Sequence, residues 1–171
     1  MKLEDIRDGA TVLVDANILL YARQGSSTRC REFLVRCNRE AVSGVITTVI
    51  LAEFCHRQMM IEARATGVAA SSPVKTLGRN PAKVRQLSSY AADVRNLLGG
   101  GLHVETVGPA DFPVALEIQK QHGLLTNDAL NLAVARRMGI HEIATADSDF
   151  DDIQGCIAYR PDDLPPAPPA P

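Results

Sequence analysis

Tryptophan is absent from this 171-residue chain, and aromatic residues make up only 4% of it. A protein that binds bases on an open stacking platform needs exposed aromatic side chains, so this scarcity argues against such a surface. No run approaches the roughly 20 apolar residues that a membrane-spanning helix requires. The first residues also lack the pattern of a secretory signal peptide, and we therefore expect a cytoplasmic protein with no membrane segment.

The cysteines follow neither the C-x-x-C spacing nor the spacing typical of a zinc site. There are four of them, Cys30, Cys37, Cys55 and Cys156. Cys30 and Cys37 lie seven residues apart around Phe33 and Leu34, which places both on one buried stripe of a helix. We interpret all four as reduced thiols and not as a disulfide framework. The formal net charge of -2 does not by itself indicate a class of partner.

Short strand-like runs alternate with longer helical runs along the chain. The strand-like runs are 11–14, 44–46, 102–107 and 143–145, with a possible edge strand at 156–158. Helices are expected near 16–23, 27–40, 49–65, 81–98, 109–122 and 126–138, with a loop or insertion over 67–81. This alternation predicts an α/β fold with a central, mostly parallel sheet of four to five strands flanked by helices.

The length of the chain predicts a single domain, which we place at residues 1–160. Residues 161–171 hold six of the ten prolines. Such a composition favours an extended, flexible tail at the end of the domain.

Carboxylates stand at the end of strands in four separate segments. Asp15 follows the first strand, and Glu53 lies in the helix after the second strand. Asp128 occupies the first turn of a later helix, while Asp147 and Asp149 follow the fourth strand. A single aspartate in the position of Asp15 would often only cap its helix. Acids in four such segments favour a shared site, because ligands of open α/β sheets bind at the carboxyl ends of the strands.

Convergence of these carboxylates would require a compensating cation or bound protons. No lysine lies in the four segments to act as an internal counter-ion. Oxygen ligands suit Mg²⁺ or Mn²⁺, whereas zinc prefers cysteine and histidine. A divalent ion held in this way can polarise a phosphoryl oxygen and lower the pKa of a bound water. The pattern therefore indicates hydrolysis of a phosphodiester.

Four stretches of the chain resemble the PIN-domain ribonucleases, especially the VapC-type toxins of toxin–antitoxin pairs. In chain order they are residues 12–17, 47–53, 125–130 and 144–150. The resemblance implies a PIN-like three-layer fold in which Asp15, Glu53, Asp128 and Asp147 bind metal and carry catalysis. It also implies that Asp149 is an additional acid of the same loop, and that Asn17 and Thr145 orient the carboxylates.

The same resemblance implies an endoribonuclease that depends on Mg²⁺ or Mn²⁺ and serves as the toxin of a type II pair. Its implied partners are an RNA substrate, a cognate antitoxin protein and a second copy of the chain. The segment at about 67–101 departs from the compact family pattern, since it is longer than a minimal toxin requires.

Three alternative functions stay open from the sequence. The chain could be a PIN-domain nuclease of RNA processing, or a catalytically silent PIN module that binds RNA or protein. A third possibility is an aspartyl-phosphate phosphotransferase or phosphatase with Asp15 as the nucleophile. Haloacid-dehalogenase-like proteins, however, carry a second aspartate two residues further on, where this chain has Asn17.

The stretch from His56 to Arg95 is basic, with seven Lys or Arg against two acids, a local balance of +5. Basic side chains beside an acidic pocket would offset its repulsion of a phosphate backbone. We therefore predict that the basic helical insertion at about 67–101 binds RNA through Lys75, Arg79, Lys83 and Arg85. The alternative is an ordinary solvated helix face with a loop.

Overall fold

A computed structural model describes residues 1–164, which form a five-stranded sheet in which every neighbouring pair is parallel. The strands are β1 (Thr11–Val14), β2 (Ser43–Thr47), β3 (Leu102–Glu105), β4 (Glu142–Ala144) and β5 (Ile157–Tyr159). Their order across the sheet is β3-β2-β1-β4-β5. The prediction of a parallel α/β fold, including the edge strand near 156–158, is confirmed.

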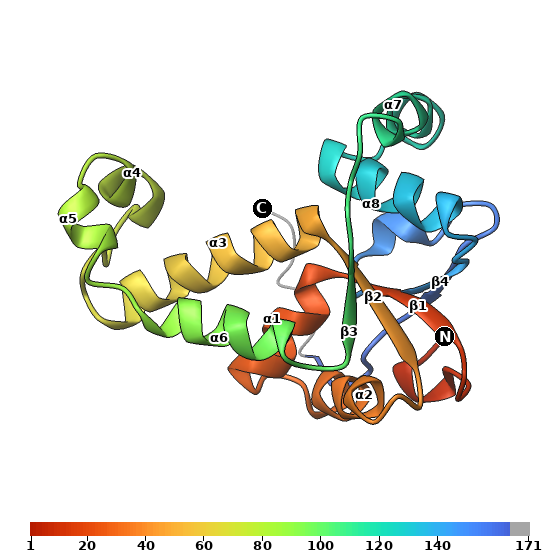
Figure 1. Ribbon diagram of the computed structural model, residues 1–171, viewed down its shortest axis with the longest axis horizontal. Helices are drawn as coiled ribbons and strands as arrows, with labels where there is room; N and C mark the ends of the chain where they lie inside the picture. The colour runs from red at the N-terminus through yellow and green to blue at the C-terminus, as the bar shows by residue number, and fades with distance from the viewer. Residues whose placement is uncertain (165–171) are drawn as a thin grey trace.

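Helices cover both faces of this sheet (Figure 1). They are α1 (Ala16–Gln24), α2 (Thr28–Asn38), α3 (Thr48–Ala65), α4 (Pro73–Gly78), α5 (Pro81–Val84), α6 (Ser89–Leu98), α7 (Asp111–His122) and α8 (Thr126–Arg137). In Figure 1, α7 and α8 lie above the strands, and α2 lies below them. Within residues 1–164, the helices are too short or too polar for any to cross a bilayer.

Strands are added to one side of β1 first and then to its other side, so the direction of strand addition reverses in the middle of the sheet. From β1 the chain moves outward through β2 to β3, and it then returns past β1 to add β4 and β5. Parallel crossovers are right-handed, so the two halves of the chain place their helices on opposite faces. The reversal lies between β1 and β4, and the crevice outside their carboxyl ends is the expected ligand site of such a sheet.

The central strand is buried on both faces, as its unbroken apolar run predicts. Val12, Leu13 and Val14 are at most 1% exposed, and Leu13 pairs with Val45 of β2 and Ile143 of β4. Cys30 and Cys37 of α2 pack in the same core, and all four cysteines are free thiols. Burial raises the pKa of each of these two buried thiols to about 11, which keeps them protonated.

The second half of α3 extends away from the sheet and carries a small hydrophobic cluster of its own (Figure 1). We call residues 59–87, which include α4 and α5, the helical arm. The buried members of its cluster are Met60, Ala63, Ala69, Leu77 and Leu87.

The expected loop over 67–81 and single helix over 81–98 are wrong in detail. Instead, α4 lies within the expected loop, and α5 and α6 are separated at residues 85–88. The break is stabilised by Glu62 of α3, whose carboxylate accepts hydrogen bonds from the backbone N–H groups of Ser88, Ser89 and Tyr90 at 2.8–3.0 Å. A buried side chain from another helix therefore replaces local capping at the start of α6.

At its start, the tail predicted to be flexible makes bonds to the rest of the protein. Asp163 accepts hydrogen bonds from the hydroxyl of Ser27 and the backbone N–H groups of Thr28 and Arg29. The carboxylate of Asp162 forms an ion pair with Lys2 at 3.1 Å. Asp162 and Asp163 are thus bonded to the N-terminus and to the start of α2, while residues 165–171 lie outside the described part of the chain.

Candidate active site

One polar cavity of about 470 Å³ opens at the carboxyl ends of β1 and β4. Four of the predicted acids line it, each contributed by a different segment of the chain. Its lining residues are Asp15, Asn17, Glu53, Arg57, Leu125, Thr126, Asn127, Asp128 and Asp147. The structure therefore brings together the end of β1, the first half of α3, the start of α8 and the loop after β4, as the sequence pattern predicts.

Asp15 stands at the N-cap position of α1, yet its side chain makes no capping hydrogen bond. Its Oδ2 atom instead accepts a hydrogen bond from Asn17 Nδ2 at 2.5 Å and another from Thr145 Oγ1 at 2.7 Å. Both donors bind the same oxygen, and together they fix the orientation of the carboxylate. A carboxylate that only capped its helix would bond to the backbone of the first turn. The interpretation of Asp15 as a simple helix cap is therefore wrong.

Thr145 is fully buried and acts as the centre of this network. Its hydroxyl donates its one proton to Asp15 and accepts hydrogen bonds from Asn17 Nδ2 and from the backbone N–H of Asp147. Asn17 Oδ1 also accepts a hydrogen bond from the backbone N–H of Ala146. Asn17 and Thr145 thus fix the Asp15 carboxylate relative to the loop after β4.

Glu53 lies beside a positive charge that the sequence pattern did not include. The guanidinium of Arg57, one turn further along α3, forms an ion pair with Glu53 at an Nε–Oε1 distance of 3.1 Å. The four acidic segments hold no lysine, as noted from the sequence, but Arg57, just outside the second segment, supplies a counter-ion to the cavity. Residues at i and i+4 are neighbours on a helix surface. The Glu53–Arg57 ion pair could therefore have been predicted from the sequence.

Asp128 experiences the strongest electrostatic effect in the cavity. Burial, reinforced by the charges of Asp15, Asp147, Glu53 and Asp149, raises the pKa of Asp128 to about 6. Burial also raises the pKa of Asp15, although the hydrogen bond from Thr145 opposes the shift. These two carboxyls hold protons more tightly than ordinary aspartates, chiefly because burial disfavours the charged form and secondly because the neighbouring acids repel it.

Asn131, one turn after Asp128, positions α8 against α3. Its Oδ1 accepts a hydrogen bond from the hydroxyl of Thr47 at 2.6 Å, and both residues are buried. The Thr47 oxygen also caps α3 by accepting a hydrogen bond from the N–H of Ile50. This contact joins the helices that carry Glu53 and Asp128. The sequence pattern places Asn131 and Asp128 on one face of the helix but does not identify this bond.

The structure separates the two acids of the last loop. Asp147 lines the cavity, and its Oδ1 accepts a hydrogen bond from the N–H of Asp149 at 3.0 Å. The exposed Asp149 is absent from the lining of the cavity, so it contributes charge at longer range.

The donor set of the cavity fits a hydrated divalent cation. Within residues 1–164, no three carboxylate, histidine or cysteine side chains lie together as a ready-made direct ligand set. Magnesium retains several of its waters and is commonly bound through one or two carboxylates, so direct coordination by three side chains is not required. Four carboxylates line the cavity, and their mutual repulsion favours a bound cation.

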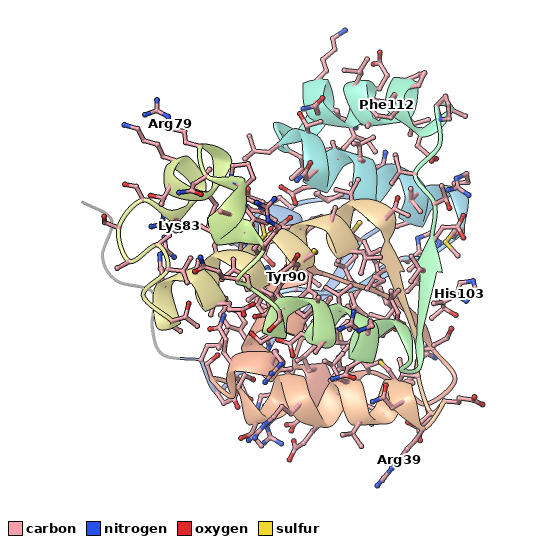
Figure 2. The ribbon with its side chains drawn as sticks, turned by 60° about the vertical axis from the view of Figure 1, so that its left-hand side comes forward. Arg39, Arg79, Lys83, Tyr90, His103 and Phe112 are labelled. Carbon is pink, nitrogen blue, oxygen red and sulfur yellow. The ribbon has the colours of Figure 1, made fainter. Side chains whose placement is uncertain are left out.

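The predicted RNA-binding residues lie on the helical arm, outside the lining of the cavity. Lys75, Arg79 and Arg85 are exposed, and Figure 2 shows the side chain of Arg79 extending into solvent. Lys83 is different, because its Nζ donates a hydrogen bond to the carbonyl oxygen of Val68 at 2.7 Å. Its ammonium group thus stabilises the arm internally.

A comparison with protein families identifies the fold. The family model described as the PIN domain matches residues 12–155, which include every acid that lines the cavity. The chain belongs to the PIN-domain family. No curated protein sequence matches it.

Solved structures of toxin–antitoxin systems share this PIN fold. VapBC2 from Rickettsia felis, bound to a DNA fragment from its promoter, aligns with a TM-score of 0.57 and 17% identity over 89% of this chain and 99% of that chain. A toxin–antitoxin complex from Klebsiella pneumoniae aligns with a TM-score of 0.53 and 17% identity, over 85% of this chain and 95% of that chain. VapC20 of Mycobacterium tuberculosis is described as a toxin that cleaves the sarcin–ricin loop. It aligns with a TM-score of 0.54 and 17% identity, over 82% of this chain and 92% of that chain. At this identity the likeness concerns the fold.

Proposed function

We propose that this PIN-domain protein is an endoribonuclease that requires Mg²⁺ or Mn²⁺ and hydrolyses RNA phosphodiester bonds. One observation carries the proposal: Asn17 and Thr145 hold Asp15 through hydrogen bonds, in a cavity that Asp15 shares with Glu53, Asp128 and Asp147. An inert domain would gain nothing from carboxylates that are clustered in one cavity, where burial and then their mutual repulsion raise the pKa of Asp128 to about 6.

In this proposal Asp15, Glu53, Asp128 and Asp147 hold the divalent ion, directly or through its waters, and Asp149 adds negative charge from outside the cavity. The ion supplies an acidified water and stabilises charge on the phosphoryl oxygens. Asn17 and Thr145 position Asp15, and the Thr47–Asn131 bond maintains the distance between the helices of Glu53 and Asp128. Lys75, Arg79 and Arg85 bind flanking phosphates from the arm and carry no sequence readout.

We further propose that the enzyme is the toxin of a type II toxin–antitoxin pair in the cytoplasm. The fold neighbours from Rickettsia felis and Klebsiella pneumoniae are toxin–antitoxin assemblies, which supports a cognate antitoxin as a partner of this chain. A second copy of the chain is the other proposed partner. Purification from the native host followed by mass measurement of the intact complex tests both, and a bare monomer with no companion protein would contradict them.

Incubation of the purified protein with mixed RNAs tests the nuclease proposal. We expect cleavage with Mg²⁺ or Mn²⁺, no cleavage with EDTA, and loss of cleavage in Asp15→Asn. Retained folding of Asp15→Asn, measured by circular dichroism, separates loss of the metal site from loss of structure. Equal cleavage by Asp15→Asn and the wild-type protein would refute the assignment of Asp15.

A further inference from the structure

Arg57 lines the acidic cavity and has few partners of its own. Its guanidinium forms one ion pair, with Glu53, and makes no hydrogen bond within residues 1–164. Arg137 shows the contrast, because its nitrogens donate hydrogen bonds to Asp111, Glu105 and the carbonyl oxygen of Thr106. The side chain of Arg57 is 54% exposed and also lines the cavity.

The position of Arg57 lies between the acids and the basic arm. Glu53 and Arg57 are one turn apart on α3, a rise of about 6 Å along the helix axis. The same helix continues toward α4 and α5, as Figure 1 shows; the exposed Lys75 lies in α4, and the exposed Arg79 directly follows it. Arg57 is the one Lys or Arg that lines the acidic cavity within residues 1–164.

We propose that Arg57 is a substrate-binding residue that changes partner when the site is loaded. Without a divalent ion it neutralises Glu53. When an ion draws the Glu53 carboxylate toward itself, the guanidinium is released and binds an RNA phosphate next to the bond that is cut. Its planar fork of N–H donors matches the geometry of a phosphate, and repulsion from the ion favours the release. This inference rests on the proposed function.

The geometry of the ion pair is consistent with such an exchange. The Arg57–Glu53 contact is an ion pair at 3.1 Å without the alignment of a hydrogen bond, and both side chains keep access to solvent, at 54% and 26% exposure. Ion pairs of this i, i+4 type that remain open to solvent contribute little to stability, so the pair can open at low cost. A phosphate beside a bound cation offers Arg57 a stronger partner.

Three variants test the proposal, namely Arg57→Gln, Arg57→Lys and the control Arg39→Gln. Arg39 is an exposed arginine at the end of α2 whose side chain points away from the body of the protein in Figure 2, and its removal changes the net charge equally. The first measurement titrates Mn²⁺ alone by calorimetry. We expect Arg57→Gln to bind Mn²⁺ several-fold more tightly, because the ion no longer competes with the guanidinium, and Arg39→Gln to bind as the wild type does.

The second measurement follows the binding of a mixed-sequence, phosphorothioate-linked single-stranded RNA across a salt series, in EDTA and in Mn²⁺. We expect Arg57→Gln to match Arg39→Gln in EDTA, to bind about tenfold more weakly in Mn²⁺, and to lose about 0.7 of the salt slope there, as one bound phosphate predicts. Arg57→Lys should recover the slope and only part of the affinity, because it keeps the charge without the fork.

Equal RNA binding by Arg57→Gln and Arg39→Gln in Mn²⁺ would overturn the proposal, since Arg57 would then be only a counter-ion of Glu53. A loss that is the same in EDTA and in Mn²⁺ would overturn the exchange of partners. Neither measurement requires cleavage. Failure of the nuclease assay would therefore reject the proposed function separately from the role of Arg57.

Discussion

The hydroxyl of Thr145 donates a hydrogen bond to Oδ2 of Asp15 at 2.7 Å, which joins residues 130 positions apart in the sequence. The two residues follow β4 and β1, the neighbouring strands between which the chain reverses direction. This bond fixes the orientation of the Asp15 carboxylate before any ligand binds. Preorganisation of this kind is what a metal-dependent site needs, because a free carboxylate would lose entropy on binding.

Replacement of Thr145 by valine should weaken metal binding and leave the fold in place. Valine has nearly the same shape but cannot donate to Asp15 or accept from the N–H of Asp147. Removal of such a supporting hydrogen bond typically costs 10–100-fold in metal affinity, and we expect about that range for Mn²⁺ measured by calorimetry. The unpaired N–H of Asp147 should also lower the free energy of unfolding by about 1–3 kcal/mol.

Thr145→Ser is the matched control, because it restores the hydroxyl and removes only a methyl group. It should recover most of the Mn²⁺ affinity. If Thr145→Val and Thr145→Ser bind Mn²⁺ equally well, the hydroxyl has no role in orienting Asp15.

Asp128→Asn should stabilise the metal-free protein in a pH-dependent way. The pKa of Asp128 is about 6 in the folded state and 3.8 in a model peptide, so the folded protein binds more protons between these values and its stability falls as pH rises through them. In EDTA at about pH 8, we expect the variant to exceed the wild type by about 1–3 kcal/mol in urea unfolding. At about pH 3.5 the difference should vanish. A constant difference at both pH values would be inconsistent with this shift.

Glu62→Gln should loosen the start of α6 without affecting the acidic cavity. Burial opposes the charge of Glu62, but three backbone N–H donors outweigh it and lower the pKa below its usual value of 4.5. This contribution to stability is therefore present above about pH 4.5 and is lost as pH falls through the lowered pKa.

At pH 7 we expect Glu62→Gln to cost about 1–3 kcal/mol and to speed hydrogen exchange at Ser88, Ser89 and Tyr90. Exchange at Asp15 and Asn17 should be unchanged. Unaltered exchange at the three α6 amides would show that the carboxylate does not hold them.

The basic residues of the arm should contribute affinity and little to the cleavage step. The triple variant Lys75→Gln, Arg79→Gln, Arg85→Gln should bind single-stranded RNA more weakly and lower the salt slope by up to about 0.7 for each phosphate that is no longer bound. Cleavage of the bound complex should stay nearly constant. A salt slope equal to that of the wild type would mean that these charges do not touch phosphate.

Lys83→Gln, made separately, should behave differently from the triple variant. The Lys83 ammonium is bonded to the carbonyl oxygen of Val68, so its loss should weaken packing of the arm more than it weakens RNA binding. A lower melting temperature with an unchanged salt slope is the expected result. An unchanged melting temperature with a shallower salt slope would instead show that Lys83 binds RNA.

Local pattern explains which parts of the fold are predictable. The apolar run of β1, the cap at Thr47 and the end of α7 at Gly123, whose φ of 75° suits glycine, are all encoded by neighbouring residues. The division of 81–98 into two helices is not, because the carboxylate that holds the start of α6 comes from Glu62 in another helix. Contacts between distant segments leave no local periodicity.

The same distinction applies to the site. Asp15 and Asp147 are visible in the sequence because each follows a strand, and parallel strands end at one edge of a sheet; Glu53 and Asp128 lie near the start of helices. The pairing of Arg57 with Glu53 is available as an i, i+4 spacing, whereas the Thr47–Asn131 bond joins residues 84 positions apart and appears only in the fold. The hydrogen bonds between Asp163 and the start of α2 also join distant residues. The proline-rich composition around Asp163 does not predict them.

Sequencing of both ends of each cut in RNA treated with Mn²⁺ tests the central claim most directly. Attack by an activated water with the 3′ oxygen leaving gives a 5′ phosphate and a 3′ hydroxyl, without use of the ribose 2′ hydroxyl. We predict these ends for the wild-type protein and no cuts for Asp15→Asn. Products that end in 2′,3′-cyclic phosphates would contradict the account, since they indicate attack by the 2′ hydroxyl under general acid–base catalysis.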